Sequence, residues 1–198
     1  MDKRIKQNKS DKTRVQEHPI MFNSQMVRAI LDRHKTQTRR PVKPMKHPYG
    51  EWLSVEEVVG EIKAETGAVI CPFGRKGDRL WVRETWNMFD PWVGVFYAAD
   101  DHSCGIGEYD DPDHIEPHNM RWKPSIHMPR WASRITLQIT KARVEQLREI
   151  TAEDAAAEGF AGHDPIAGFA DAWNEIYGGS SWADNPWVWV IEFMRVKL

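Results

Sequence analysis

Cysteine is scarce in this sequence, with only Cys71 and Cys104 among 198 residues. Two cysteines cannot build the disulfide framework of a small secreted protein, so a reducing compartment is expected. No apolar run approaches the roughly 20 residues that cross a bilayer. Residues 1–18 also lack the apolar core of a secretory signal. We therefore expect a cytoplasmic protein without a membrane partner.

The sequence also lacks internal repeats and any familiar metal-ligand spacing. Four side chains could be read as zinc ligands, but their spacing matches no zinc-finger pattern; they are His102, Cys104, His114 and His118. They fall in a stretch, 100–118, that has seven Asp or Glu and no Lys or Arg, typical of a solvated acidic loop. We therefore predict an acidic insertion near 100–120, and neither a metal nor another cofactor.

Charge is present in quantity but unevenly distributed. Residues 1–50 hold 13 Lys or Arg and 4 Asp or Glu, a net charge of +9, which leaves −11 on residues 51–198 because the whole chain carries −2. A basic end indicates a polyanionic partner such as RNA, although a solubilising tail would look the same. Residues 1–17 have no hydrophobic periodicity, and we predict a disordered basic tail followed by one domain over 18–198.

Hydrophobic periodicity predicts short strands and few helices. Strands are expected at 18–22, 77–86, 93–98, 134–140 and 186–196. Helices are expected after the candidate N-caps Ser24, Thr151 and Asp164. This mixture predicts an α+β fold, with a small, strongly curved sheet or β-barrel and flanking helices.

The stretch HKTQTRR, residues 34–40, concentrates reactive side chains. Lys35, Arg39 and Arg40 can bind phosphate, and Thr36 or Thr38 can hydrogen-bond it or act as a nucleophile. A threonine hydroxyl needs a base, and a lysine whose pKa is lowered by burial or nearby cations can serve as one. In an extended chain Lys35 and Thr38 point to opposite sides, so their cooperation would require a turn. The alternative is a solvated basic turn.

Two glutamates stand out by their positions. Glu84 falls on the same strand face as Leu80 and Val82, which should point inward. A buried carboxylate needs a partner, which residues 34–40 could supply, and the alternative is a purely structural ion pair. Glu158 ends the Ala-rich segment TAEDAAAEG. By position alone, Glu158 is an ordinary exposed glutamate near a helix end.

The segment WKPSIHMPRWASR, residues 122–134, interleaves cations with indoles. The cations are Lys123, His127, Arg130 and Arg134, and the indoles are Trp122 and Trp131. Cations for phosphate and aromatic rings for stacking are the ingredients of RNA recognition. Because tryptophan is also a common core residue, this segment can equally be an ordered structural loop.

Together these segments resemble a known family. The segments follow one another as an apolar helix, HKTQTRR, GDRLWVRETW, WKPSIHMPRWASRI, TAEDAAAEG and NPWVWVIEF. This order is similar to that of ASCH-domain proteins of the PUA-like superfamily, most closely the larger ASCH proteins of bacteriophage and prophage genomes. The resemblance covers about 18–196. The tail and parts of 45–70 and 100–120 lie outside it.

The resemblance implies a small β-barrel with flanking helices, whose cleft binds RNA or nucleotides. One branch of the family hydrolyses N4-acetylcytidine, and its catalytic Lys, Thr and Glu would correspond to Lys35, Thr38 and Glu158. This chain is larger than that branch and carries the 122–134 loop and the acidic insertion, so its ligand or activity can differ. Likeness of fold does not choose among these functions.

Three functions follow as expectations. The first is binding of RNA, single-stranded nucleic acid or a modified nucleoside in a basic cleft. The second is an amidohydrolase acting on N4-acylated cytidine through Lys35, Thr38 and Glu158. The third is a small ribonuclease with His127 and Lys35 as acid–base groups. The expected ligand-binding residues are Arg39, Arg40, Glu84, Trp86, Lys123, Ser125, His127, Arg130, Trp131 and Arg134.

Overall fold

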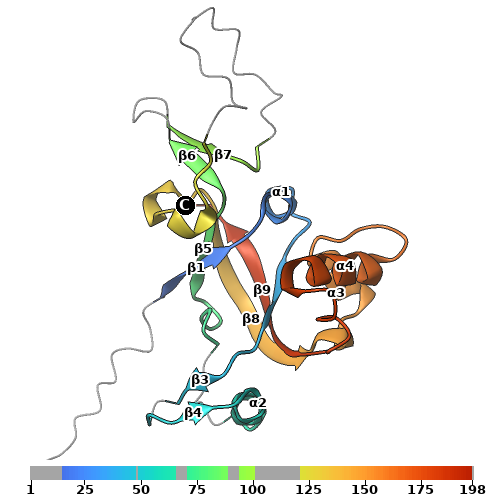
Figure 1. Cartoon of the computed structure of the whole chain (residues 1–198). Coiled ribbons are helices and arrows are strands. Elements are labelled where there is room, and N and C mark those ends of the chain that lie inside the picture. Colours follow the sequence, from blue (N-terminus) through green and yellow to red (C-terminus); the bar gives the residue numbers. More distant parts are fainter. Residues whose placement is uncertain (1–14, 48, 66–70, 89–93, 101–120, 198) are drawn as a thin grey trace, which may run out of the picture.

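The protein has an α+β fold, as the sequence predicts, in which one curved five-stranded sheet carries most of the core (Figure 1). The structure is a computed structural model, and it describes residues 15–47, 49–65, 71–88, 94–100 and 121–197. None of the helices in these ranges is long and apolar enough to cross a lipid bilayer.

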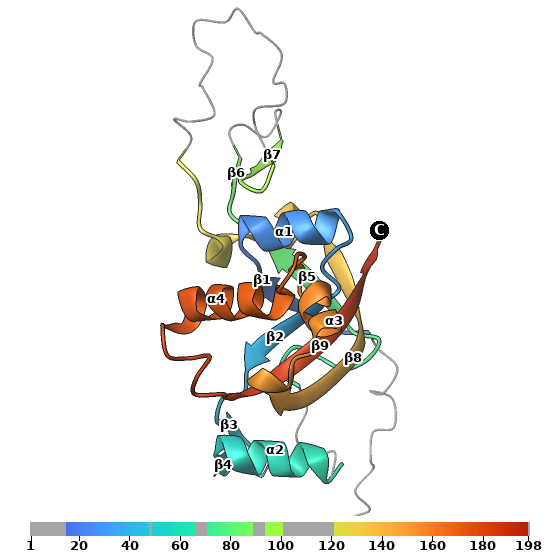
Figure 2. The same ribbon diagram turned by 90° about the vertical axis from the view of Figure 1, so that its right-hand side faces the viewer.

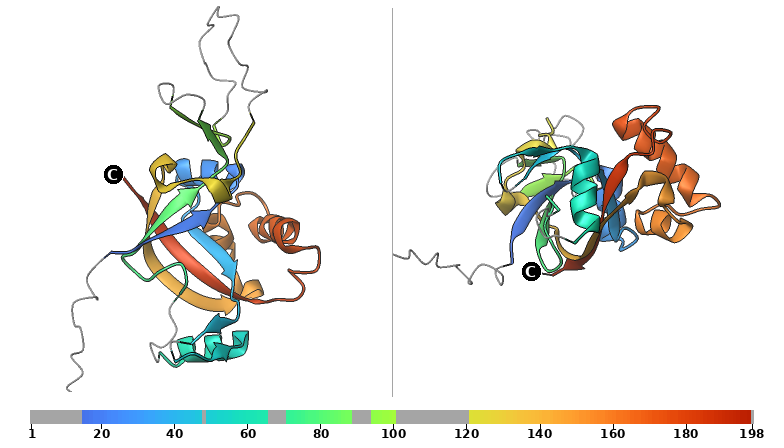
Figure 3. Two further views of the ribbon diagram at one scale, coloured as in Figure 1. Left: turned by 60° about the vertical axis from the view of Figure 1, so that its left-hand side comes forward. Right: turned by 90° about the horizontal axis from the view of Figure 1, so that it is seen from below.

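The five-stranded sheet has the order β1-β5-β8-β9-β2. The strands are β1 (Glu17–Met21), β5 (Arg79–Arg83), β8 (Thr136–Gln146), β9 (Trp187–Val196) and β2 (Gln37–Pro41). β1 and β5 are parallel, and the other pairs are antiparallel. The sheet curves strongly (Figure 3), but β1 and β2 remain its two edges. The open curved sheet is therefore formed, and the closed barrel is not.

The two long central strands show why the sheet has two buried sides. In β8 and just before it, Ile135, Leu137 and Ile139 are buried in the main core, as their alternation predicts. In β9, the run Val188–Ile191 is buried on both faces. Ile191 faces the main core, whereas Val190 belongs to a second cluster with residues of α3 and α4. The continuous apolar run in β9 follows from that double cover.

Four helices surround the sheet in the described parts of the chain. α1 (Ser24–Leu31) is capped by Asn23, whose side chain accepts a hydrogen bond from the Met26 amide at 2.8 Å, so the predicted cap at Ser24 is wrong by one residue. α3 (Ala152–Ala157) begins with the predicted Thr151 cap, and α4 (Pro165–Tyr177) with the predicted Asp164 cap. α3 and α4 pack beside β2 and β9 (Figure 1).

Smaller elements extend from the two ends of the sheet (Figure 2). At one end lie the strands β3 (Met45–Lys46) and β4 (Trp52–Leu53) with helix α2 (Val55–Lys63). At the other lies the hairpin of β6 (Trp86–Met88) and β7 (Val95–Tyr97). The predicted strand 77–86 therefore breaks after Arg83, because Trp86 pairs with Tyr97 and Lys123 instead of continuing β5. Short 3-10 helices cover Ser125–His127 (η2), Arg130–Ala132 (η3) and Leu147–Glu149 (η4).

The described residues include only the ends of the predicted tail and of the predicted acidic insertion. Glu17, expected in the tail, begins β1, and the Gln16 amide donates to Asp78 Oδ1 at 3.0 Å. The tail was therefore predicted too long, because hydrogen bonding to β5 and its preceding turn orders these residues. Residues 1–14 and 101–120 lie outside the described residues, and with them most of the predicted tail and insertion.

Truncating Ile191 tests the core. This residue is fully buried in the middle of β9, so Ile191→Ala should lower the free energy of unfolding by about 2–5 kcal/mol. Met194→Ala, at a half-exposed position of the same strand, should change it by no more than about 0.5 kcal/mol. Urea denaturation measures both, and equal effects would contradict the described packing of β9.

Candidate functional site

Lys35 and Glu158 are brought together by the junction of α1, β2 and α3. The Thr36 amide donates to the Ala157 carbonyl at 2.8 Å, which ties the chain before β2 to the last turn of α3. Glu158 is the C-cap of α3, and Gly159 follows with φ of +100°. A Cβ atom at Gly159 would lie 3.2 Å from Ala29 Cβ and 3.4 Å from Lys35 Cβ. Glycine therefore allows the end of α3 to approach both α1 and Lys35.

Lys35 and Glu158 form a buried ion pair. Lys35 Nζ lies 2.7 Å from Glu158 Oε2 and also donates to the Glu158 carbonyl at 2.8 Å. The two residues are 2% and 4% exposed, so the expectation of an exposed Glu158 is wrong. Burial lowers the pKa of Lys35, the Glu158 carboxylate opposes this, and Arg40 and Arg39 lower it further. Lys35 thus combines a close carboxylate with an environment that disfavours its charged form.

Arg39 is buried beside this pair and is surrounded by carboxylates. Its guanidinium lies 3.3 Å from Glu158 Oε1 and 3.1 Å from Asp154 Oδ2, and it also pairs with Glu145. Its side chain has no exposed surface. We expected Arg39 to bind phosphate, but in this structure its charge is already neutralised and is inaccessible. Its role here is structural, because it joins β2 to β8 and α3.

Thr38 lies on β2 between these charged residues. It pairs with Ile191 across the sheet, whereas Arg39 pairs with Val190, so their side chains alternate between the two faces. Thr38 and Glu158 line one small cavity of about 30 Å³, room for roughly one water molecule. The Thr38 hydroxyl has no hydrogen-bond partner among the described residues. The turn that cooperation between Lys35 and Thr38 would require is not formed, because the chain is extended from Gln37 onwards in β2, and no Lys35–Thr38 hydrogen bond is found among the described residues.

Glu84 belongs to a different cluster from Lys35. It is 1% exposed, which confirms the inward position, but its carboxylate accepts two hydrogen bonds from Arg134, at 3.0 and 2.9 Å. Arg134 also pairs with Asp100 at 2.7 Å and lies over the Tyr97 ring. Burial raises the pKa of Glu84, and Arg134 counteracts this. The partner is therefore Arg134 and not the 34–40 stretch, and both side chains are engaged within the protein.

The other residues expected to bind nucleic acid lie in η2 and η3 or, for Trp86 and Lys123, in β6 and the chain that pairs with it. Arg130 pairs with Glu17 at 2.9 Å, and Lys123 lies 4.9 Å from the centre of the Trp86 ring. Trp86 is buried, whereas Trp131 is 63% exposed and meets Trp86 edge-on. Ser125 and His127 lie in η2, where His127 is exposed. None of these side chains lines the small Thr38 cavity.

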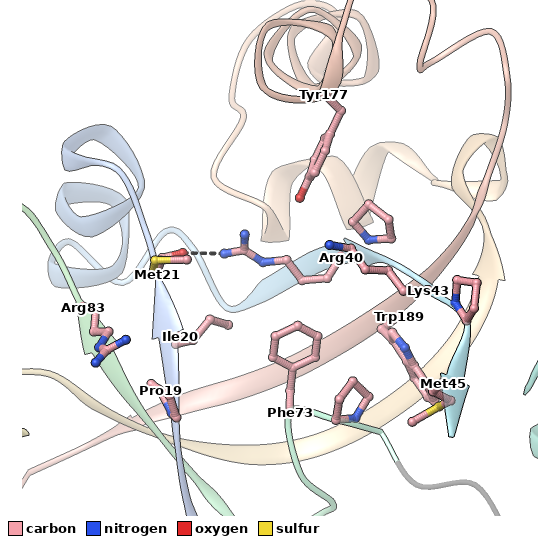
Figure 4. A pocket seen from close by; sticks show the side chains of 13 residues that line it. Pro19, Ile20, Met21, Arg40, Lys43, Met45, Phe73, Arg83, Tyr177 and Trp189 are labelled. Atoms are coloured by element: carbon pink, nitrogen blue, oxygen red, sulfur yellow. Dashed lines mark hydrogen bonds between the residues drawn. The ribbon is translucent and has the colours of Figure 1, made fainter. Parts of the chain in front are cut away.

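A larger cavity, the edge pocket, opens between the two edge strands of the sheet (Figure 4). It holds about 500 Å³ and is lined by Pro19, Ile20, Met21, Arg40, Pro41, Lys43, Pro44, Met45, Pro72, Phe73, Arg83, Tyr177 and Trp189. Arg40 crosses from β2 to donate a hydrogen bond to the Met21 carbonyl of β1 (Figure 4). Arg40 and Tyr177 also line the small Thr38 cavity, so the two cavities adjoin.

The edge pocket combines aromatic rings with cations that have no carboxylate partner among the described residues, although Arg40 donates to the Met21 carbonyl and Arg83 Nε donates to the Met128 carbonyl at 3.2 Å. Phe73, Tyr177 and Trp189 contribute rings, and Arg40, Lys43 and Arg83 contribute positive charge. None of these three cations has a carboxylate partner among the described residues, and no acidic side chain lines the pocket. The Arg40 Nε is buried without a hydrogen-bond acceptor in that part of the chain. The pocket can therefore bind a flat, negatively charged molecule.

Of the edge-pocket residues, only Arg40 was identified from the sequence. Lys43 offered a signal, because it continues the basic run of 34–40 beyond Pro41. Arg83 was visible as the neighbour of Glu84 on the opposite strand face, where it points away from the predicted buried side. Phe73 lies in CPFGRKGD, which has no periodicity, so no sequence signal identifies it.

The described residues contain no group of three or more His, Cys, Asp or Glu side chains that could hold a metal ion. The four His and Cys residues considered as zinc ligands lie outside the described residues. Comparisons with models of known protein families, with curated proteins and with solved structures each found no match. The function is therefore inferred from the residues that line the cavities.

Replacing Glu158 tests the buried pair. Glu158→Gln should lower the free energy of unfolding by about 3–5 kcal/mol near neutral pH, because Lys35 stays buried without its anion. The pKa of folded Lys35 then lies further below its ordinary value of 10.5, so the unfolded chain binds more protons. The stability of the variant should therefore rise as pH increases towards about 10.

Urea denaturation over a pH series measures this effect. Glu175→Gln, at an exposed position of α4, is the matched control and should change stability little. A Glu158→Gln variant as stable as the parent protein at neutral pH would contradict a charged Lys35–Glu158 pair.

Proposed function

We propose that this chain is an ASCH-type protein that binds RNA or a modified nucleotide in the edge pocket. The observation that carries the proposal is an aromatic lining between β1 and β2 together with three cations, Arg40, Lys43 and Arg83, that have no carboxylate partner among the described residues. The volume of about 500 Å³ falls within the range of small-ligand sites. The resemblance described above supports the same ligand class.

The chemistry of a nucleotide matches this lining. A base can stack against aromatic side chains, at about 1–3 kcal/mol per base, without a sequence-specific hydrogen bond. Its phosphate can receive charge-assisted hydrogen bonds from guanidinium and ammonium groups. Arg40 offers an unsatisfied Nε, and Lys43 is exposed at the rim. Both halves of the ligand therefore have complementary groups in the pocket.

Neutralising the cations tests this proposal. The combined change Arg40→Gln, Lys43→Gln and Arg83→Gln should weaken binding of cytidine 5′-monophosphate at least about tenfold, since each charge-assisted hydrogen bond contributes about 1.5–3 kcal/mol. Binding of cytidine, which has no phosphate, should change less. Phe73→Leu should weaken binding of both through lost stacking. Isothermal titration calorimetry measures these affinities.

The matched control is Arg148→Gln, which removes an exposed cation that does not line the pocket. It should leave both affinities unchanged. If the pocket variants bind the nucleotide as the parent protein does, the edge pocket is not the nucleotide site.

A second candidate function is hydrolysis of an N4-acylated cytidine. The observation that favours it is the direct Lys35–Glu158 contact, together with Thr38 on the wall of the cavity that Glu158 lines. In this proposal the Lys35 proton first passes to Glu158 across their direct contact, so that neutral Lys35 can accept the proton of the Thr38 hydroxyl, whose oxygen attacks the acyl carbonyl. The bond between the carbonyl carbon and N4 then breaks as Glu158 protonates the leaving N4, and the Glu158 carboxylate positions the water that releases the acyl group from Thr38. The nuclease alternative has no such support, because His127 is exposed, Lys35 is buried and no described contact joins them.

The proposed reaction requires a rearrangement. The cavity beside Thr38 has room for about one water, whereas the adjoining edge pocket can hold a nucleoside. Phe169, Trp173 and Tyr177 of α4 line the small cavity together with Thr38, which is itself buried. A substrate in the edge pocket would therefore need these rings to shift so that its acyl group reaches Thr38.

Thr38→Val gives a clean test of catalysis. The hydroxyl has no described hydrogen-bond partner, so its removal should leave stability nearly unchanged while lowering deacylation by several orders of magnitude. Lys35→Met should have a similar effect, and the double variant should lose little more, because groups that act as a unit are non-additive. Thr38→Ser should retain part of the activity.

Release of cytidine from N4-acetylcytidine measures the reaction. Activity that survives Thr38→Val would exclude Thr38 as the nucleophile. A parent protein inactive on the nucleoside and on the same base within an oligonucleotide would exclude the hydrolase and leave the binding function.

A further inference from the structure

A second cavity lies at the other end of β2 from the edge pocket. This second pocket holds about 500 Å³ and is lined by Ile30, Arg33, Lys35, Thr36, Leu137, Phe193, Met194, Arg195 and Lys197. Its apolar lining includes the buried side chains of Ile30, Leu137 and Phe193. Among the described residues, all of its charged side chains are cationic, and they come from the end of α1, the chain before β2 and the last residues of β9 and beyond.

The exposed cations of the second pocket are available to an external anion. Arg33, Arg195 and Lys197 are exposed, and none has a carboxylate partner among the described residues. By contrast, Arg39 and Arg134 are each bound by two or more carboxylates. The protein thus neutralises the guanidinium groups of Arg39 and Arg134 internally and leaves these three cations unpaired within the described chain. A cavity lined by one sign of charge attracts the opposite charge.

The backbone at Arg33 gives independent support. Arg33 follows the C-cap of α1 and has φ of +63°, in the left-handed region. Glycine is the usual residue at this position, because a side chain there costs about 1–2 kcal/mol. The turn is held by the Arg33 amide donating to Ile30 and the His34 amide donating to Ala29. An arginine here is unfavourable for the backbone, and its side chain lines the second pocket.

Strand β2 joins the two pockets. Thr36 lies just before this strand and lines the second pocket, while Arg40 near its end lines the edge pocket. They are four positions apart in the sequence, so their Cα atoms are roughly 13 Å apart at about 3.3 Å per residue. A handful of nucleotides can cover this separation even at the compact spacing of about 3.4 Å per nucleotide.

We propose that the partner is a single-stranded polynucleotide, whose backbone phosphates bind Arg33, Arg195 and Lys197 while one nucleotide occupies the edge pocket. This inference rests on the proposed nucleotide-binding function and extends it from one nucleotide to a strand. The edge pocket alone accounts for the binding of a mononucleotide. The second pocket increases the affinity for a polynucleotide but not for a mononucleotide, because its cations contact phosphates beyond the first nucleotide.

The test compares cytidine 5′-monophosphate with a single-stranded oligocytidylate of about ten nucleotides. The parent protein should bind the oligonucleotide more tightly. The combined change Arg33→Gly, Arg195→Gln and Lys197→Gln should weaken oligonucleotide binding at least about tenfold. It should also reduce the slope of log affinity against log salt by about 2, because each phosphate contact contributes about 0.7. Binding of the mononucleotide should not change.

Two controls separate this effect from unfolding and from net charge. Arg33→Gly removes a side chain from a left-handed position, so the melting temperature should stay the same or rise while oligonucleotide binding weakens. Arg75→Gln, Lys76→Gln and Lys141→Gln together remove three exposed cations beside another part of the sheet and should leave the salt slope nearly unchanged.

The outcomes distinguish the two proposals. A normal mononucleotide affinity with an oligonucleotide that binds no tighter, or with an unchanged salt slope in the variant, would overturn the strand proposal and leave the edge pocket intact. Failure of the parent protein to bind either probe would overturn the nucleotide-binding function itself, and the strand proposal with it.

Discussion

Two buried cations on one short stretch of chain set the arrangement around the site. Lys35 and Arg39 have almost no contact with solvent, and a buried charge is tolerated only with an opposite charge close by. Glu158 meets this need for both, because its carboxylate reaches one cation with each oxygen. Helix α3 therefore has to end against the beginning of β2. Its capping residue, the following glycine and the contact with α1 all serve that position.

This internal neutralisation divides the basic segment into two parts with different roles. Arg39 is committed to carboxylates, whereas Arg40, its neighbour on the opposite face of β2, has none in the described chain. Strand alternation thus places one arginine in the structural cluster and the next at the edge pocket. Two neighbouring arginines of one basic run therefore differ in role: Arg39 is buried and paired with carboxylates, whereas Arg40 is available in the edge pocket.

The sequence predicts the elements better than it predicts their partners. The alternation in β8, the double burial of β9 and the caps of α3 and α4 were all visible, because they depend on local periodicity and local hydrogen bonds. The need of Glu84 for a cation was also visible. That Arg134 supplies it, 50 residues away, depends on how β5 and β8 pair, which a single sequence does not encode locally.

The contact between Arg40 and the Met21 carbonyl has a mechanical consequence. Every other neighbouring pair of strands in the large sheet is held by a ladder of backbone hydrogen bonds, but the edges β1 and β2 are joined by this side chain. A charged hydrogen bond of this kind contributes about 1.5–3 kcal/mol, and less where it is exposed to water. The gap between β1 and β2 can therefore widen without breaking backbone hydrogen bonds between paired strands. The sheet is thus a curved wall open along one line between β1 and β2, and a single described side-chain hydrogen bond spans that opening.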